Sequence, residues 1–329
     1  LLTYLDAILR VYNRYGNRDN KYKARIKILV RAWTPEVFAQ RVEAEWAHLK
    51  DGPATLNGSE IERVTGFFTL PDYRSIDDAS ADAQVTALAA DNKAFSRWLD
   101  RNVRAQKQPG YVSVTLSLKP AGVAPGDVTD QQLEIIADLA DRFSFGEIRS
   151  THNQNVVLAD VAKDDLFELW QQAKAAGLAT PNIGTINDMI CCPGGDYCSL
   201  ANAKSIPVAE AIQRKFDDLD YVYDLGNLEL NISGCMNACG HHHIGHIGIL
   251  GVDKKGEEWY QIQLGGSANK AAALGKVLGP SLSRDAVTDS VEKLLDVYVE
   301  NRIEGEAFLG TYQRIGIEKF KQRVYDTAS

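Results

Sequence analysis

Four of the chain's five cysteines fall into two closely spaced pairs, and this pattern restricts the fold more than any other feature of the sequence. The pairs are Cys192 with Cys198 and Cys235 with Cys239, each in a loop that contains glycine. Thiolates are soft ligands that bind Zn²⁺ or iron–sulfur clusters. Structural zinc sites favour gaps of about two to four residues between paired ligands, whereas the gaps here are five and three residues. We therefore expect a [4Fe-4S] cluster in preference to zinc, with the two pairs meeting in space.

Two other roles compete with metal binding at these cysteines. Isolated cysteines often serve as small buried hydrophobic residues, but proline, glycine, aspartate and asparagine surround these four, which is typical of loops. Disulfide bonds need an oxidising compartment, and the sequence shows no signal peptide. We expect reduced cysteines in a cytoplasmic protein.

The surroundings of the first pair predict an anionic thiolate at Cys198. The residues from Ser199 to Gln213 are mostly good helix formers, so Cys198 is expected near a helix start, where free backbone N–H groups favour a negative charge. Cys191 precedes Cys192 directly and would give a gap of six residues. We favour Cys192 as the ligand, although loop geometry decides between the two.

The composition indicates a soluble globular protein. The 329 residues, 45% hydrophobic and 24% charged, suffice for two packed domains and contain neither a membrane-spanning run nor a low-complexity tract. A formal net charge of -8 argues against a broad nucleic-acid surface. Any site for an anion therefore has to be built from a local group of cations.

The first part of the chain mixes helical and extended patterns. A helical stripe of apolar residues begins at Leu1, and the segment Tyr22 to Val30 reads as a partly buried strand with Arg25 and Lys27 on one face. Thr34 to Leu49 is expected to be an amphipathic helix that opens with proline. Residues 51–108 are expected to be a connector or docking surface.

A regular pattern of strands and helices begins at Tyr111. It comprises a strand at 111–118, a helix at 130–143, two short strands within 146–161, a helix at 163–178, strands at 228–233, 245–252 and 258–264, and a helix from 284 to about 301. This order predicts an α+β fold in which helices cover one face of an antiparallel or mixed sheet.

The chain resembles the C-terminal part of the sirohaem-containing nitrite and sulfite reductase haemoproteins, of the beta-subunit type. The resemblance rests on the two cysteine pairs, with support from Thr151-His-Asn-Gln-Asn155, the Leu264-Gly-Gly266 strand end, Gly305-Glu-Ala-Phe308 and Arg314-Ile-Gly316. It implies repeated α/β sandwich units: residues 1–50 as the end of a preceding repeat, 51–108 as the connector, 109–180 as a ferredoxin-like half domain, and 181–329 as the [4Fe-4S]/sirohaem-binding domain.

The same resemblance implies which residues bind the cofactors. The four cluster ligands would be Cys192, Cys198, Cys235 and Cys239, and Cys239 would also be the axial ligand of the sirohaem iron. Other contacts to sirohaem would come from Thr151, Asn153, Gln154, Asn155, Gly234 and Asn237. From the residues alone, the polar run 151–155 is equally well explained as a turn that satisfies its own backbone.

Sirohaem and its oxyanion substrate both carry negative charge, so the pocket needs cations. Arg25 and Lys27 match the position of a basic pair that the family places over the sirohaem, where they would bind the anion and support proton delivery. The family commonly has two lysines there, and arginine is a poor proton donor. The alternative is an ordinary solvated basic face on an edge strand.

Four histidines follow the second cysteine pair: His241, His242, His243 and His246. A mixed Cys/His zinc site or a proton relay is one explanation. Three adjacent histidines cannot all face one ion, so we expect one or two to line the cofactor pocket and the others to support it or lie on the surface.

The resemblance implies a six-electron reduction of sulfite to sulfide at a sirohaem bridged to a [4Fe-4S] cluster, with reduction of nitrite to ammonia as the alternative. The electron donor would be ferredoxin or a flavoprotein subunit. Two non-enzyme alternatives remain: a zinc-stabilised or redox module, and an inactive fragment that lacks sirohaem because an earlier repeat would contribute further arginines. These alternatives differ in metal content and colour.

Overall fold

The computed structural model describes residues 1–20 and 23–326, which divide into two compact units, Leu1–Tyr73 and Arg74–Ser329. The described part of the first unit is helical and contains α1 (Leu2–Tyr15), α2 (Ile26–Trp33), α3 (Pro35–Trp46) and α4 (Gly58–Thr65). Its small core forms where α1 packs on α3, with Ala7, Val11 and Val42 buried. The expected helix at Thr34 to Leu49 is therefore confirmed by α3.

No helix in the described ranges has the length and apolar character needed to cross a membrane.

The strand expected at Tyr22 to Val30 is wrong over the described residues. Tyr22 lies outside them, and the chain enters α2 at Ile26 after Arg25 as the extended N-cap residue. A strand needs a neighbouring strand to satisfy its backbone groups, and the described residues of the first unit contain none. A helix satisfies these groups within itself, so the β-branched residues of this segment do not decide its structure.

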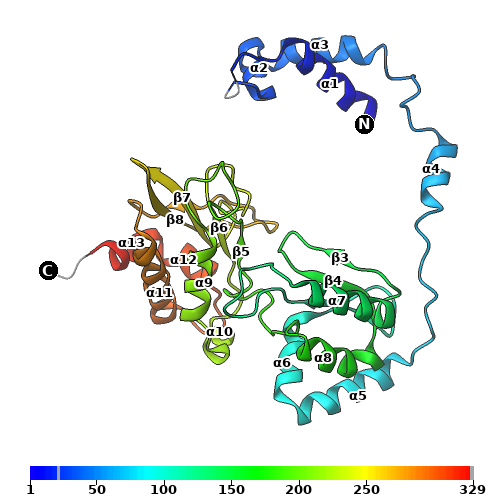
Figure 1. Ribbon diagram of the computed structural model, residues 1–329, viewed down its shortest axis with the longest axis vertical. Coiled ribbons are helices and arrows are strands. Elements are labelled where there is room, and N and C mark those ends of the chain that lie inside the picture. Colours follow the sequence, from blue (N-terminus) through cyan, green and yellow to red (C-terminus); the bar gives the residue numbers. More distant parts are fainter. Residues whose placement is uncertain (21–22, 327–329) are drawn as a thin grey trace. The chain divides into compact units, whose positions relative to one another are not determined.

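The second unit begins with an antiparallel sheet and its covering helices (Figure 1). Its strands, in the order β1-β2-β4-β3, are β1 (Val103–Ala105), β2 (Tyr111–Leu116), β4 (Val156–Ala162) and β3 (Arg149–Ser150). Its helices are α5 (Asp78–Asp91), α6 (Lys93–Asn102), α7 (Asp130–Phe143), the short 3-10 helix Lys163–Asp165, and α8 (Leu166–Ala175). Thr129 and Gln132 form a capping box that begins α7 where the sequence predicts it.

Part of the segment expected to be a connector, residues 51–108, packs against the four-stranded sheet and its helices. Phe95 and Trp98 of α6 are fully buried in one core with residues of β2 and α7. The sequence from Asp77 to Arg104 is polar on average, although it contains an amphipathic helix. Only one face of α6 is apolar, so the average does not reveal it.

The second sheet of this unit is a five-stranded mixed sheet in the order β5-β6-β7-β8-β9. The strands are β5 (Ile190–Cys191), β6 (Leu230–Ser233), β7 (Ile247–Lys254), β8 (Glu257–Leu264) and β9 (Lys276–Val277). β5, β6 and β7 are parallel, and the remaining pairs are antiparallel. The helices are α9 (Ile206–Lys215), α10 (Leu219–Leu225), α11 (Arg284–Asn301), α12 (Phe308–Ile315) and α13 (Ile317–Tyr325). α9 and α11 lie side by side next to the sheet (Figure 1), and the predicted α+β fold with mixed and antiparallel sheets is confirmed.

The helices α12 and α13 repeat the pattern of α2 and α3. In both places an eight-residue helix is followed by one residue with positive φ, Thr34 at 74° and Gly316 at 78°, and then by a second helix. The third helices share the spacing of Phe38-Ala-Gln-Arg-Val42 and Phe320-Lys-Gln-Arg-Val324. A positive φ is sterically unfavourable for Thr34, whereas Gly316 adopts it freely because it has no side chain.

The same hydrogen bond joins the helices in both copies. The Tyr12 hydroxyl donates to the Ala24 carbonyl at 2.9 Å, and the Tyr298 hydroxyl donates to the Glu306 carbonyl at 2.9 Å. An arginine lies over each tyrosine ring, Arg18 in the first copy and Arg302 in the second. The segments α1–α3 and α11–α13 thus share a helix pattern, a tyrosine hydrogen bond and an arginine–tyrosine contact.

The two copies differ in what covers the first helix. Val291 and Leu295 of α11 are fully buried in the core beneath the five-stranded sheet. Their counterparts on α1, counted back from the matching tyrosines, are Leu5 and Leu9, and both are exposed. α1 therefore carries an apolar stripe of the kind that α11 packs against a sheet.

Candidate functional site

The two cysteine pairs lie at the same edge of the five-stranded sheet. Cys192 directly follows β5, and Cys235 comes just after the end of β6. β5 and β6 are parallel neighbours, with Cys191 opposite Ile232, so their carboxyl ends meet at one edge. The sheet topology thus explains why residues more than forty positions apart form one site.

The two cysteine loops touch each other. The Gly234 N–H donates to the Cys192 sulfur at 3.1 Å, and Asn202 donates its N–H to the Gly234 carbonyl at 2.8 Å. A Cβ atom at Gly234 would lie 2.6 Å from the Cα of Gly194, closer than real side chains allow. Glycine is needed here because the backbones of the two loops are in contact.

Cys191 and Cys192 have different surroundings. Cys191 points into the core, and burial raises the pKa of its thiol well above the ordinary value. The sulfur of Cys192 lies 3.7 Å from the Ser205 hydroxyl, in addition to its contact with Gly234. A metal binds the thiolate form, so this geometry favours Cys192 over Cys191.

The helix expected from Ser199 to Gln213 forms only in its second part, as α9, and the expected start next to Cys198 is wrong. Cys198 lies in a loop, and α9 begins only at Ile206. The intervening residues instead wrap around the second loop, because Ala203 donates its N–H to Gly234 and Lys204 bridges Gly194. The proposed helix dipole therefore cannot act on Cys198.

The remaining pair differs in exposure, since Cys235 is buried and Cys239 is exposed. Among the residues that the structure describes, no three His, Cys, Asp or Glu side chains converge closely enough to hold a metal ion. The donor chemistry nevertheless fits an iron–sulfur cluster, because four cysteines on two touching loops are soft, reduced ligands.

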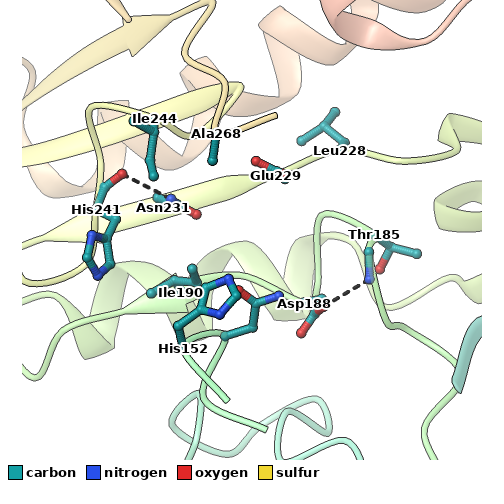
Figure 2. Close-up of a pocket in the computed structure, with 12 residues that line it drawn as sticks. His152, Thr185, Asp188, Ile190, Leu228, Glu229, Asn231, His241, Ile244 and Ala268 are labelled. Atoms are coloured by element: carbon teal, nitrogen blue, oxygen red, sulfur yellow. Dashed lines mark hydrogen bonds between the residues drawn. The ribbon is translucent and has the colours of Figure 1, made fainter. Parts of the chain in front are cut away.

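A cavity of about 490 Å³ opens next to β5 and β6, and Ile190 and Asn231 are among its lining residues (Figure 2). One wall contains Leu228, Glu229 and Asn231, and the facing wall contains His152, Asp188 and Ile190, as Figure 2 shows. The other lining residues are Asn153, Gly184, Thr185, His241, Ile244 and Ala268. Its volume is within the range of cofactor and ligand pockets.

The polar run 151–155 forms the turn between β3 and β4. The Asn155 N–H donates to the Thr151 hydroxyl, and both the hydroxyl and the N–H of Thr151 donate to the Asn155 carbonyl. Gln154, inside this turn, has a positive φ of 57°. Gln154 directs its amide to Cys191, and Asn155 donates to the Asp188 carboxylate at 2.8 Å. Asn153 is the member of the predicted set that lines the cavity.

A buried ion pair lies behind the cavity wall. The Lys119 ammonium contacts the Asp188 carboxylate at 2.8 Å and donates to the Asn153 carbonyl. The Lys119 side chain is fully buried, and burial lowers its pKa although Asp188 opposes the shift. The second carboxylate oxygen of Asp188 accepts the Gly184 N–H at 2.9 Å. Both residues that accept hydrogen bonds from the Lys119 ammonium, Asn153 and Asp188, thus line the cavity.

The four histidines after the second pair have separate roles. His241 lines the cavity, and His246 accepts the Glu229 N–H at 3.2 Å. His243 lies 3.5 Å from the Gln263 side chain. His242 is fully buried, and neither ring nitrogen has a hydrogen-bond partner. Within the described residues these histidines do not form a zinc site with the cysteines.

Acidification should destabilise the chain through His242. Burial, with a smaller contribution from His243, lowers the pKa of His242 from 6.5 to about 4. The unfolded chain takes up this proton below about pH 6.5 and the folded chain does not, so stability falls between about pH 6.5 and pH 4. We expect His242→Leu to reduce the loss of unfolding free energy between about pH 7 and pH 5 by on the order of 1 kcal/mol. Urea titrations of both proteins at the two pH values measure it, and equal losses would contradict the assignment.

The other predicted residues belong to two different units. Gly234 and the second cysteine pair, with Asn237 between its members, lie on the cysteine loops. Arg25 and Lys27 are exposed at the start of α2, in the first unit, and their role at an anion site stays a prediction.

Sequence reasoning missed Lys119 and Asp188. The one available signal was a lysine directly after the apolar end of a predicted strand, where a solvated side chain is the usual outcome. The burial of Lys119 depends on a partner nearly seventy positions away, which no local pattern reveals.

Comparison with known proteins agrees with this architecture. Residues 104–176 match the family described as Nitrite/Sulfite reductase ferredoxin-like half domain. Residues 1–50 and 184–329, more than half of the chain, match the Nitrite and sulphite reductase 4Fe-4S domain.

Similar proteins carry both substrate names. "Sulfite reductase [ferredoxin] 2" of Mycolicibacterium paratuberculosis is 27% identical over 92% of this chain and 49% of its own length. "Assimilatory ferredoxin-dependent nitrite reductase" of Haloferax mediterranei is 26% identical over 92% of this chain and 47% of its own. The solved structure of Mycobacterium tuberculosis NirA protein superposes with a TM-score of 0.64 at 25% identity, covering 96% of this chain and 52% of that one. The chain spans about half the length of the curated relatives it matches.

Proposed function

The chain belongs to the nitrite and sulphite reductase 4Fe-4S domain family, and from that premise we propose that it takes part in the six-electron reduction of sulfite to sulfide. The observation that carries the proposal is the contact between the two cysteine loops at the ends of parallel strands, where Gly234 bonds Cys192. In this proposal the [4Fe-4S] ligands are Cys192, Cys198, Cys235 and Cys239. When bound, the cluster and sirohaem supply electrons singly to an oxyanion.

The cavity is the proposed place for sirohaem. Ile190, Leu228 and Ile244 offer apolar surface to a macrocycle, and Asn153 offers a polar contact at the rim. Gly234 and Asn237 would contact the macrocycle from the cysteine loops, and the exposed Cys239 would bind its iron.

The cavity offers little positive charge of its own. Its lining, within the part of the chain that the structure describes, contains no lysine or arginine. A ligand rich in carboxylates needs such cations. Arg25 and Lys27, which are exposed at the start of α2, stay our candidates to bind an oxyanion and hold protons near it.

We also infer the organisation of the chain from its repeat. The match between α1–α3 and α11–α13 supports residues 1–50 as the end of a preceding repeat, ahead of the half domain at 109–180 and the cluster domain at 181–329. The proposed electron donor is ferredoxin, which the names of both relatives above mention, with a flavoprotein subunit as the alternative. Reduced cysteines suit a cytoplasmic location.

Nitrite reduction to ammonia is the second candidate function. A nitrite reductase of Haloferax mediterranei is as similar to this chain as the sulfite reductases are. Both substrates are small oxyanions reduced by six electrons, so the same site suits either. Steady-state turnover of each substrate by the loaded protein would choose between them.

The test of the proposal is the metal content and absorption spectrum of the chain after anaerobic reconstitution with iron, sulfide and sirohaem. We expect about five iron atoms per chain, four in the cluster and one in sirohaem, with about four labile sulfides and a haem band that shifts or disappears in Cys239→Ser. Zinc in a colourless protein would contradict the proposal and favour the zinc-stabilised module. A cluster without the haem band would restrict this chain to a fragment that binds only the cluster.

A further inference from the structure

We propose that Gln154 is a positioning residue that holds the backbone of the proposed cluster ligand Cys192 in place. The inference rests on the proposed function and assigns Gln154 a role other than contact with sirohaem. It follows from three features of the structure. These are the two hydrogen bonds between the Gln154 side chain and the Cys191 backbone, the short strand that precedes Cys192, and the hydrogen-bonded turn that carries Gln154.

The side-chain amide of Gln154 pairs with both backbone groups of Cys191. Its Nε2 donates to the Cys191 carbonyl at 2.8 Å, and its Oε1 accepts the Cys191 N–H at 2.8 Å. This two-point contact reproduces the pairing that a neighbouring strand would supply. A single side chain thereby covers the open edge of β5.

The other edge of this strand is already occupied. Cys192 donates its N–H to the Ile232 carbonyl at 3.1 Å on the β6 side. Backbone groups of successive strand residues point to opposite edges, so Cys191 and Cys192 are held from the two sides. β5 has only two residues, and few other bonds hold the chain at the point where the cysteine loop begins.

Gln154 is itself held in place before it reaches Cys191. Its N–H donates to the Thr151 carbonyl at 3.1 Å, and the next residue, Asn155, is anchored to Asp188 and to the Leu118 N–H. Its positive φ of 57° is unfavourable for glutamine and persists because these contacts determine the turn.

The position of Cys192 decides the contact between the two cysteine loops. Its sulfur accepts the Gly234 N–H at 3.1 Å. Without the Gln154 amide, both Cys191 backbone groups on the open edge lose their partner. The Cys192 backbone then keeps its N–H bond to Ile232 and the bond that its carbonyl accepts from the Cys191 thiol. Groups that orient metal ligands typically change metal affinity about 10- to 100-fold when removed.

The test compares Gln154→Met and Gln154→Gly with Gln132→Met in the full chain. Gln132 is a matched control, because its amide also bonds two backbone groups in the half domain, the Ala176 carbonyl and the Thr129 N–H. Each protein is loaded anaerobically with iron and sulfide, and the rate of iron release to a chelator is measured together with the electron paramagnetic resonance spectrum of the reduced cluster. Circular dichroism and the melting temperature report the fold.

We expect iron release to accelerate about 10-fold or more in both Gln154 variants, with a changed spectrum, and to stay at the wild-type rate in Gln132→Met. Gln154→Gly relieves the positive φ, so a purely structural role of the turn would leave this variant close to wild type and overturn the inference. Wild-type rates and spectra in both Gln154 variants would also overturn it while leaving the proposed cluster intact. A wild-type chain that takes up no cluster would overturn the inference and the proposed function together.

Discussion

Replacing Cys192 with serine should abolish cluster binding, whereas replacing the adjacent Cys191 with serine should leave it intact. Cys191 lies in the core, where burial raises the pKa of its thiol and disfavours the thiolate that a metal requires. Cys192 accepts the Gly234 N–H from the second cysteine loop. The two variants differ only in which of two neighbouring sulfurs is lost, so a general effect of losing a cysteine cannot explain a difference between them.

The measurement is iron and labile sulfide per chain after anaerobic reconstitution. We expect Cys191→Ser to bind about as much iron as the wild type, and Cys192→Ser to bind about tenfold less or none. Cys198→Ser and Cys235→Ser should resemble Cys192→Ser. Loss of the cluster in Cys191→Ser with retention in Cys192→Ser would reverse the assignment of the ligand.

Replacing Lys119 with methionine should destabilise the second unit by about 3 to 5 kcal/mol. The substitution leaves the Asp188 carboxylate, whose side chain is only 4% exposed, without its ammonium partner. It also removes the donor to the Asn153 carbonyl. The free energy of unfolding from urea titration measures the loss.

Two further variants separate the buried charge from other effects. Adding Asp188→Asn to Lys119→Met removes the uncompensated carboxylate and should restore about 2 kcal/mol. Lys163→Met is the matched surface control, because Lys163 pairs with the half-exposed Asp78 and Asp82, and it should cost about 1 kcal/mol or less. Equal losses in Lys119→Met and Lys163→Met would contradict the role of the buried pair.

Much of the second unit could be predicted because its local patterns agree with its packing. The helices at Asp130–Phe143 and Arg284–Asn301 have clear caps and apolar faces, and both form as expected. The alternation from Tyr111 likewise becomes β2. The two helices depend on residues within one or two turns of each other, and the alternation of the strand shows its buried face, so the sequence displays both signals directly.

The failed predictions involve segments whose partners are distant or missing. Arg25 and Lys27 were placed on a strand, yet no strand lies beside them in the described first unit, and the segment is helical. The residues after Cys198 have helical propensity, but hydrogen bonds from Asn202 and Ala203 to the Gly234 carbonyl hold them in a loop. In both cases tertiary context outweighs local preference, which is worth only tenths of a kcal/mol per residue.

The sequence by itself determined the class of fold and the chemistry of the site, because four cysteines in two glycine-bearing loops already specify soft metal ligands. The tertiary structure alone decided which of two adjacent cysteines faces the second loop, and which polar residue of the 151–155 turn reaches Cys191 in place of the cavity. The physical reason is that adjacent strand residues point in opposite directions and that a buried pair such as Lys119 and Asp188 depends on a distant partner. Residue type is a local property, whereas direction and burial come from the packed chain.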